Sequence, residues 1–471
     1  MARRWQILAV VSVAVFMASL DLFIVNIAFP DIQRDFDGAG AATVSWVLNG
    51  YAIVFAALLV PGGRLADRLG RRRVFLAGLA LFVIGSVLCG VAPSIETLIA
   101  ARVAQAIGAA LLMPTSLALL LPEFPARERA AAIGVWAAVG GVAAAFGPPV
   151  GGLLVEASWR WVFWVNVPVG IVALVFAVRL LNESREEART RWPDLLGTLV
   201  LTAAIGLLAL GLVQAPDWHW GDPRTLGCLA GAVVLLAAFW FRCARHPSPV
   251  IDPSMLRVRS FALANTAGLL FTVSFSVMLL SNVLFMTGVW HDSVLRAGLQ
   301  LAPGPLMAAL LAVPSGRLAG RFGQHLLAGA GCLLFVLGAC WWLWRVDASA
   351  NWAGAMLPGL LIGGAGVGMV LPSLASAAAA SLPPGRFATG SAVLTMSRQI
   401  GSVLGVAILV AILGDGGAAD PVGPFQDGWL FLVASGTLAA VAGFAIGPVH
   451  HHHHQPSVAP GLVPAPAEQS V

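Results

Sequence analysis

The stretch GGRLADRLGRRRVFLAG, from Gly62 to Gly78, places six charged side chains in one short segment between two long apolar runs. The chain as a whole is strongly apolar, with 10% charged residues, 59% hydrophobic residues and a mean hydropathy of +0.87. Soluble domains carry about 25% charged residues, so a soluble globule of 471 residues with this composition would lack polar side chains for its surface. We therefore expect an all-α membrane protein, in which apolar stretches of about 20 residues cross the bilayer as helices.

Apolar runs separated by charged or Pro/Gly-rich breaks predict fourteen transmembrane helices, in the order six, two and six. The predicted spans are 6–30, 44–64, 73–92, 95–121, 130–154, 161–181, 193–213, 224–242, 260–288, 296–318, 323–345, 352–380, 387–412 and 426–447. The quoted stretch is then the loop between the second and third helices. The predicted domains are an N-terminal six-helix bundle over 1–181, a linker with two additional helices over 182–259, a C-terminal six-helix bundle over 260–447 and a disordered cytoplasmic tail over 448–471.

The distribution of basic residues predicts the orientation of the chain. All 27 basic residues are arginine, and there is no lysine. With the N-terminus inside, most arginines fall in cytoplasmic loops or adjoining helix ends, and five fall outside: Arg34, Arg160, Arg224, Arg296 and Arg345. This asymmetry follows the positive-inside rule, so we expect both termini to be cytoplasmic.

A second stretch, PSGRLAGRFGQHLLAG from Pro314 to Gly329, repeats the pattern Gly-Arg-Leu-Ala-x-Arg-x-Gly of the first. It also falls between the second and third helices of a six-helix group. The segment GAALLMPTSLALL, which begins at Gly108, likewise parallels GVGMVLPSLASAA, which begins at Gly366. Two matches in register favour two bundles related by an internal repeat, as in transporters, over a coincidental Gly/Arg loop.

Combined motifs over residues ~5–447 resemble those of the fourteen-helix drug:proton antiporter branch of the major facilitator superfamily, a group of multidrug efflux transporters. The motifs are GRLADRLGRR (Gly63–Arg72), LDLFIVNIAFP (Leu20–Pro30), RVAQAIGAA (Arg102–Ala110), GPPVGG (Gly147–Gly152) followed by WRWVFWVNVPVG (Trp159–Gly170), and RQIGSVLGVAI (Arg398–Ile408). Phe23 stands where this branch usually has Thr, and Ala106 stands where it usually has Gly. The resemblance implies the major facilitator fold and export of drugs, antibiotics or related amphipathic molecules in exchange for protons, by alternating access.

Asp21 is the only acidic residue that we place deep inside a predicted span. An ionisable side chain at that depth is costly and usually faces the bundle interior or a water-filled path. A carboxyl group that takes up a proton from one side and releases it to the other would couple transport to a proton gradient. The alternative is a structural carboxylate, paired with Arg102 or capped by its neighbours. Asn26, about one turn further along, shares a similar helix face and is a candidate to bind substrate.

Two more pairs of polar residues lie within predicted spans. Arg102 is about two turns into the fourth helix, where the resemblance implies a role in proton transfer; the alternatives are a structural ion pair or a snorkelling side chain. Gln105, about one turn away, would extend a polar path from Arg102. Arg398 and Gln399 lie in the thirteenth helix, where they either present a positive wall to the cavity or bind backbone carbonyls at a Gly-rich helix contact.

The segment Gly147–Gly152 acts on backbone shape. Proline deletes an intrahelical hydrogen bond and kinks a helix, while glycine lets another backbone approach closely. A bend built by Gly147, Pro148, Gly151 and Gly152 would seal one face of the central cavity and favour exchange over leak. Ordinary tight packing is the alternative, and the two are compatible.

The opening stretch supplies a predicted conformational latch, made of Gly63, Asp67, Arg68, Gly70 and Arg71. The positive-inside rule explains the arginines of this stretch but not the carboxylate of Asp67. A carboxylate can accept hydrogen bonds from a helix N-terminus and pair with nearby arginines. The resemblance implies that Asp67, Arg68 and Arg71 hold the two bundles together when the cavity faces outward. The second copy has Gly320 at the position of the carboxylate, so we expect a one-sided latch.

Other functional classes fit less well. An ATP-driven pump needs the phosphate-binding loop G-x-x-x-x-G-K-[ST], which a chain without lysine cannot form. A membrane enzyme needs a cluster of His, Asp or Glu, or a nucleophile with a base, whereas the histidines before the run His450–His454 are scattered over predicted loops. We therefore predict a transporter that is not an enzyme, with no cofactor and no metal site.

The expected partners are a small amphipathic substrate, protons and the lipid bilayer of a bacterial cell membrane, with no nucleic acid, and we expect a monomer. A lone membrane carboxylate suits a cationic substrate or a proton. A proton-coupled exporter of one specific metabolite and an uncoupled facilitator are the alternatives that the sequence leaves open.

Overall fold

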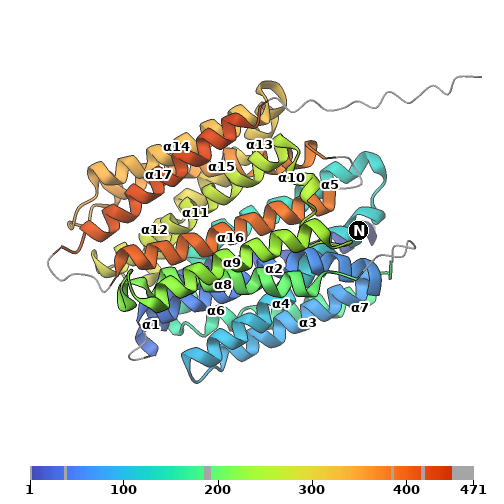
Figure 1. Ribbon diagram of the computed structural model, residues 1–471, viewed down its shortest axis with the longest axis horizontal. Coiled ribbons are helices and arrows are strands. Elements are labelled where there is room, and N and C mark those ends of the chain that lie inside the picture. Colours follow the sequence, from blue (N-terminus) through green and yellow to red (C-terminus); the bar gives the residue numbers. More distant parts are fainter. Residues whose placement is uncertain (1–2, 37–39, 185–191, 383–386, 415–419, 448–471) are drawn as a thin grey trace, which may run out of the picture.

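The computed structural model describes residues 3–36, 40–184, 192–382, 387–414 and 420–447, and this part of the chain is built from helices joined by short turns (Figure 1). The long helices are α1 (Arg3–Asp35), α2 (Ala41–Leu69), α3 (Arg71–Gly90), α4 (Ile95–Leu120), α5 (Ala126–Ala157), α7 (Asn166–Leu180), α8 (Leu195–Trp218), α9 (Pro223–Arg245), α11 (Arg259–Gly288), α13 (Pro303–Phe322), α14 (Gln324–Arg345), α15 (Leu357–Ala380), α16 (Phe387–Leu413) and α17 (Gly423–Ala445). Short helices precede four of them: α6 (Trp161–Trp164), α10 (Pro253–Leu256), α12 (Val294–Leu301) and the π-helix η2 (Trp352–Met356); the 3₁₀ turn η1 (Leu121–Glu123) follows α4.

Thirteen helical segments in the described part of the chain are long and apolar enough to cross a membrane. The helix α5 is not among them, but it has 32 residues and follows the fourth of these segments in the chain. Together they correspond to the fourteen predicted spans. The expectation of an all-α membrane protein of this type is confirmed.

Helices α2 and α3 are separated by one residue, Gly70, whose φ of 111° is strained for any residue with a side chain. The predicted break at residues 65–72 was therefore too long, because α2 continues through Asp67 and Arg68 to Leu69. Gly323, at the same place in the second copy, separates α13 from α14 with a φ of 92°. The sequence repeat thus corresponds to one repeated backbone turn.

Equivalent helix pairs in the two predicted six-helix groups pack through glycine. In the first group, a Cβ atom on Gly108 of α4 would lie 2.5 Å from the backbone nitrogen of Phe82 in α3. In the second group, a Cβ atom on Gly366 of α15 would lie 2.4 Å from the carbonyl oxygen of Gly331 in α14. Since lipid removes most of the hydrophobic drive between membrane helices, close backbone contact at small residues is what holds such pairs together.

The two additional helices, α8 and α9, pack against each other, and α8 also lies against α2 and α16 from the two groups. In Figure 1 they appear between the α1–α4 side and the α13–α17 side. The outer face of α9 is apolar, with Val233 and Val234 each 65% exposed, as suits contact with lipid. The predicted tail 448–471, with the run His450–His454, lies outside the described residues.

Candidate functional site

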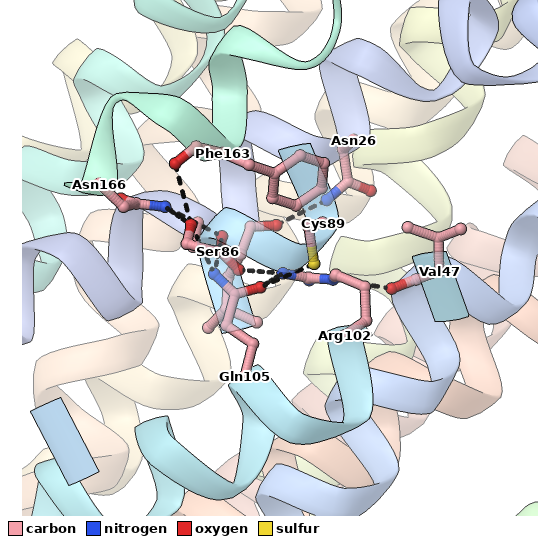
Figure 2. A network of polar contacts seen from close by, with 10 residues as sticks. Asn26, Val47, Ser86, Cys89, Arg102, Gln105, Phe163 and Asn166 are labelled. Atoms are coloured by element: carbon pink, nitrogen blue, oxygen red, sulfur yellow. Dashed lines mark hydrogen bonds and ion pairs between the residues drawn. The ribbon is translucent and has the colours of Figure 1, made fainter. Parts of the chain in front are cut away.

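Asp21 lies near the middle of α1, and its side chain is fully buried. Its carboxylate accepts hydrogen bonds from three side chains of other helices, and Figure 2 labels these donors, Arg102, Gln105 and Asn166. Arg102 donates to Oδ2 in an ion pair, while Gln105 and Asn166 donate to Oδ1 over 3.0 Å and 3.4 Å. The positive charge of Arg102 offsets the negative charge of this carboxylate, and the two amides occupy its second oxygen.

Arg102 and Gln105 lie three residues apart on α4 and therefore share a face. The side chain of Arg102 is 1% exposed. Its Nε donates to the Val47 carbonyl of α2 over 3.1 Å, and its Nη1 donates to the Gln105 side chain over 2.7 Å. Its Cζ also lies 4.1 Å from the ring centroid of Tyr51. The N-terminal group thus holds a buried charge pair with no net charge, in which each partner has neutral donors or acceptors around it.

Two polar residues that the sequence analysis missed complete this cluster. Asn166, the first residue of α7, donates to Ser86 Oγ of α3 over 3.1 Å, and Gln105 donates to the same oxygen over 3.2 Å. Ser86 in turn donates to the Phe163 carbonyl over 2.9 Å. The available signal was a small polar residue within an apolar span, but serine and asparagine are common enough in such spans that the signal is weak.

The other predicted polar residues lie outside this cluster. The Asn26 amide donates to the carbonyl of Leu22 in its own helix over 2.7 Å, so it is not part of the hydrogen-bonded network. Arg398 and Gln399 lie in the middle of α16, in the second group. Each has a buried side-chain nitrogen with no hydrogen-bond partner.

The predicted latch residues lie at one end of α2 and the start of α3. Asp67 pairs with Arg71 four residues later, with N–O distances of 3.0 Å and 2.9 Å. The Arg68 guanidinium lies 3.9 Å from the ring centroid of Trp192, which precedes α8. Within the described part of the chain, Asp67 and Arg71 form no hydrogen bond or ion pair with the second six-helix group. Gly63 precedes the other latch residues in α2, and a Cβ atom on it would lie 3.3 Å from Pro114 of α4.

The predicted antiporter motif places α5 between two partners. A Cβ atom on Gly147 would lie 2.6 Å from Phe23, and one on Gly151 would lie 3.0 Å from Ile24, so this face packs against the helix that carries Asp21. On a second face, a Cβ atom on Gly152 would lie 2.8 Å from Leu295 of α12.

The carbonyl of Pro148 approaches α12 equally closely, because a Cβ atom on Gly298 would lie 2.4 Å from that oxygen. The motif therefore brings the predicted outer half of α5 into backbone contact with the second group. Close packing and a sealed face, the two interpretations of this motif, are both compatible with that contact.

A cavity of about 690 Å³ opens at the predicted outer ends of α1, α5 and α11, with Glu156 and His291 among its lining residues. Asp292, which also lines it, is 8% exposed and pairs with Arg296 over 3.1 Å. Burial raises the pKa of the Asp292 carboxyl above 3.8, and the charge of Arg296 opposes that rise. The sequence analysis did not select this carboxylate, because it lies in a loop.

A model of the Major Facilitator Superfamily matches residues 11–406. The chain belongs to the major facilitator superfamily. It is 36% identical over 416 residues to the multidrug resistance protein Stp of Mycobacterium tuberculosis (strain CDC 1551 / Oshkosh), covering 87% of this chain and 76% of that protein. It is 34% identical over 429 residues to the tetracenomycin C resistance and export protein of Streptomyces glaucescens, covering 91% of this chain and 78% of that protein.

Solved structures agree with this assignment at the level of the fold. A crystal structure of a D-xylose-proton symporter superposes with a TM-score of 0.68 at 14% identity, covering 94% of this chain and 98% of that one. The major facilitator fold predicted from the motifs is therefore confirmed, and this member of the superfamily is a multi-pass membrane protein.

Proposed function

We propose that this member of the superfamily is a secondary active transporter that exports drugs, antibiotics or related amphipathic molecules in exchange for protons by alternating access. Relatives that cover most of the chain are named for multidrug resistance and for antibiotic resistance and export. The observation that carries proton coupling is the fully buried Asp21 with its three donors. An ionisable side chain at the centre of the membrane is costly and usually functional, which favours proton coupling over an uncoupled facilitator.

The coupling cycle follows from the surroundings of Asp21. With the predicted outer half of α5 packed on α12, Asp21 is fully buried and paired with Arg102. When that contact opens, we propose that water reaches the cluster, Asp21 takes up a proton and Arg102 loses its ion pair. Because α5 packs against both α1 and α12, a movement of one six-helix group relative to the other is transmitted to the helix that carries Asp21.

The energy available from this cycle is sufficient for export. One proton that moves down 100 mV releases about 2.3 kcal/mol, which sustains roughly a 50-fold concentration gradient of a neutral substrate. We further propose a monomer in a bacterial cell membrane, with both termini cytoplasmic, acting as a transporter without enzymatic activity, cofactor or nucleic-acid partner. The latch at Asp67 belongs to the opposite, outward-facing conformation in this proposal.

Substrate-dependent proton movement tests the proposal. Cells with and without this chain are first exposed to a panel of amphipathic antibiotics and dyes, which identifies compounds to which the chain confers resistance. Purified protein in liposomes is then given one such compound while the internal pH is recorded. We expect a pH change that depends on the compound and is lost in Asp21→Asn. Compound movement without any proton movement would support the facilitator instead.

A further inference from the structure

Arg398 is a cation within a membrane-spanning helix, and it has no counter-ion among the described residues. It lies 11 residues from the start of α16, or about 16 Å along the helix axis, too far for its side chain to reach the membrane surface. Its Nε is enclosed and has no hydrogen-bond partner, and no carboxylate of the described residues lies within ion-pair distance. The side chain as a whole remains partly exposed, so the terminal nitrogens are the part that a ligand can reach.

Neighbouring polar groups do not satisfy this arginine. Its aliphatic stem lies against Gly268 of α11, where a Cβ atom would lie 3.6 Å from Arg398 Cγ. The adjacent Ser397 donates instead to Asn265 over 3.1 Å, and Ser276 bonds with Ser402 one turn further along α16 over 2.9 Å. An arginine that only supported the helix contact would bind such oxygen atoms, as Arg102 does with the Val47 carbonyl.

We propose that Arg398 binds an anionic group of the exported molecule, so that the substrate class is an amphipathic organic acid. The inference deepens the proposed function and rests on it. Asp21 and Arg102 neutralise each other, which leaves Arg398 at mid-depth as a positive charge with no counter-charge among the described residues. A cationic substrate would be repelled there, whereas a carboxylate or another oxyanion can accept two parallel N–H bonds from the guanidinium.

An aromatic surface near Arg398 suits the apolar part of such a molecule. Gly268, Thr272 and Phe275 follow each other at helical spacing on one face of α11, so Phe275 lies about 10 Å along the helix from the stem of Arg398. Phe275 is partly exposed, lies 6.2 Å from the ring of Phe271, and meets Phe23 of α1 edge-on at 6.5 Å. An anionic group at Arg398 and an apolar body along these rings would be bound together.

Three probes of one shape test the inference: 4-(1-pyrenyl)butanoate, its N-methylamide and a pyrenylbutyl trimethylammonium cation. Binding to the purified full-length protein is measured by energy transfer from its 16 tryptophans to pyrene. We expect the wild type to bind the butanoate at least about tenfold more tightly than the amide, because only the anion adds the attraction between opposite charges and a second acceptor oxygen to the hydrogen bonds of the guanidinium. Arg398→Gln should lose this preference and Arg398→Lys should keep part of it, whereas Arg345→Gln, at an exposed position, should keep all of it.

The comparison of the three probes on the wild type tests the inference even if Arg398→Gln fails to fold. Equal or tighter binding of the amide or the cation, binding of none of the three probes, or an undiminished butanoate preference in Arg398→Gln would each overturn the anion site. Proton exchange driven by the same probes in liposomes is measured separately. If the butanoate binds at Arg398 but moves no protons, the proposed antiport is wrong and the anion site stands.

Discussion

The two six-helix groups each place an arginine near the middle of the membrane, Arg102 and Arg398, and the surroundings of these arginines differ. Arg102 in the first group has an ion pair with Asp21, two hydrogen bonds to Val47 and Gln105, and the ring of Tyr51 over its guanidinium. Arg398 in the second group has an enclosed Nε without a partner. A buried charge is tolerated when its partners are built in. The second group therefore lacks a partner that, in our proposal, the transported molecule supplies.

The largest expected effect comes from removing the carboxylate of the first group. Asp21→Asn keeps the shape of the side chain but can no longer exchange a proton, so gradient-driven efflux should fall by about two orders of magnitude. Efflux from proteoliposomes under an imposed pH gradient measures this. Asp347→Asn, in an exposed loop, is the control and should behave as the wild type. Undiminished efflux by Asp21→Asn would show that another group carries the proton.

Substitution of the two arginines should change the free energy of unfolding differently. Arg102→Gln leaves Asp21 buried and unpaired, which costs about 3–5 kcal/mol, whereas Arg398→Gln removes an uncompensated charge and should leave the stability unchanged or raised. Thermal unfolding midpoints in one detergent measure both variants. The double variant Asp21→Asn/Arg102→Gln should recover much of the loss. Equal destabilisation by the two single variants would mean that Arg398 has a structural partner after all.

The contact between the groups offers a matched pair of glycines in α5. Gly152→Ala places a methyl group against Leu295 of α12 and should destabilise this packing by about 1–3 kcal/mol, whereas a side chain at Gly140 meets no other atom within 4 Å. Gly152→Ala should therefore slow transport. It should also make the Asp21 cluster more accessible than in the wild type to chemical labelling reagents added from the predicted outer side. Gly140→Ala should do neither, and equal effects of the two would remove the contact from the mechanism.

The first group carries Asp67 at the position where the second has Gly320, so the latch is expected on one side only. Asp67→Asn removes a partly exposed pair with Arg71, which contributes about 0.5 kcal/mol or less. Expression should therefore stay intact, while loss of the outward-facing contact should slow transport roughly fivefold. Initial rates at matched protein levels test this, and unchanged rates would contradict the latch.

The smallest effect concerns Asp292, in the loop between α11 and α12. Burial raises its native pKa above 3.8, so the folded state binds the proton more tightly than the unfolded state. This contribution to stability is fully present below the ordinary pKa and is lost as the pH rises through the native pKa. Relative to Asp292→Asn, the wild type should lose stability from about pH 4 upward, by less than about 1 kcal/mol. Parallel melting curves for the two proteins would contradict this.

The fold was largely predictable from the chain. Composition required a bilayer, the charged breaks located the helices to within a few residues, and the repeated Gly-Arg-Leu-Ala-x-Arg-x-Gly motif predicted two equivalent turns, which Gly70 and Gly323 form. The main error was the length of the break after residue 64. Asp67 and Arg68 are compatible with a helix end, and only the glycine after Leu69 forces the chain to turn.

The candidate site was predictable only in part. Asp21, Arg102 and Gln105 were selected because ionisable and amide side chains are rare in apolar spans, and the structure brings them together. Ser86 and Asn166 were missed because such residues are too common to stand out. Asn26 was included because it lies one turn from Asp21, yet its amide bonds to its own helix instead.

By itself the sequence determined the solvent of this protein, the number and order of its helices and the depth of each polar residue, because depth follows from position along a helix at a rise of 1.5 Å per residue. Only the tertiary structure decided which polar residues meet. Helices that are apolar on every side give no periodic pattern to indicate which face turns toward which neighbour. Asp21 and Arg102, 81 residues apart, are therefore paired by helix packing, and packing also leaves Arg398 without a counter-ion among the described residues.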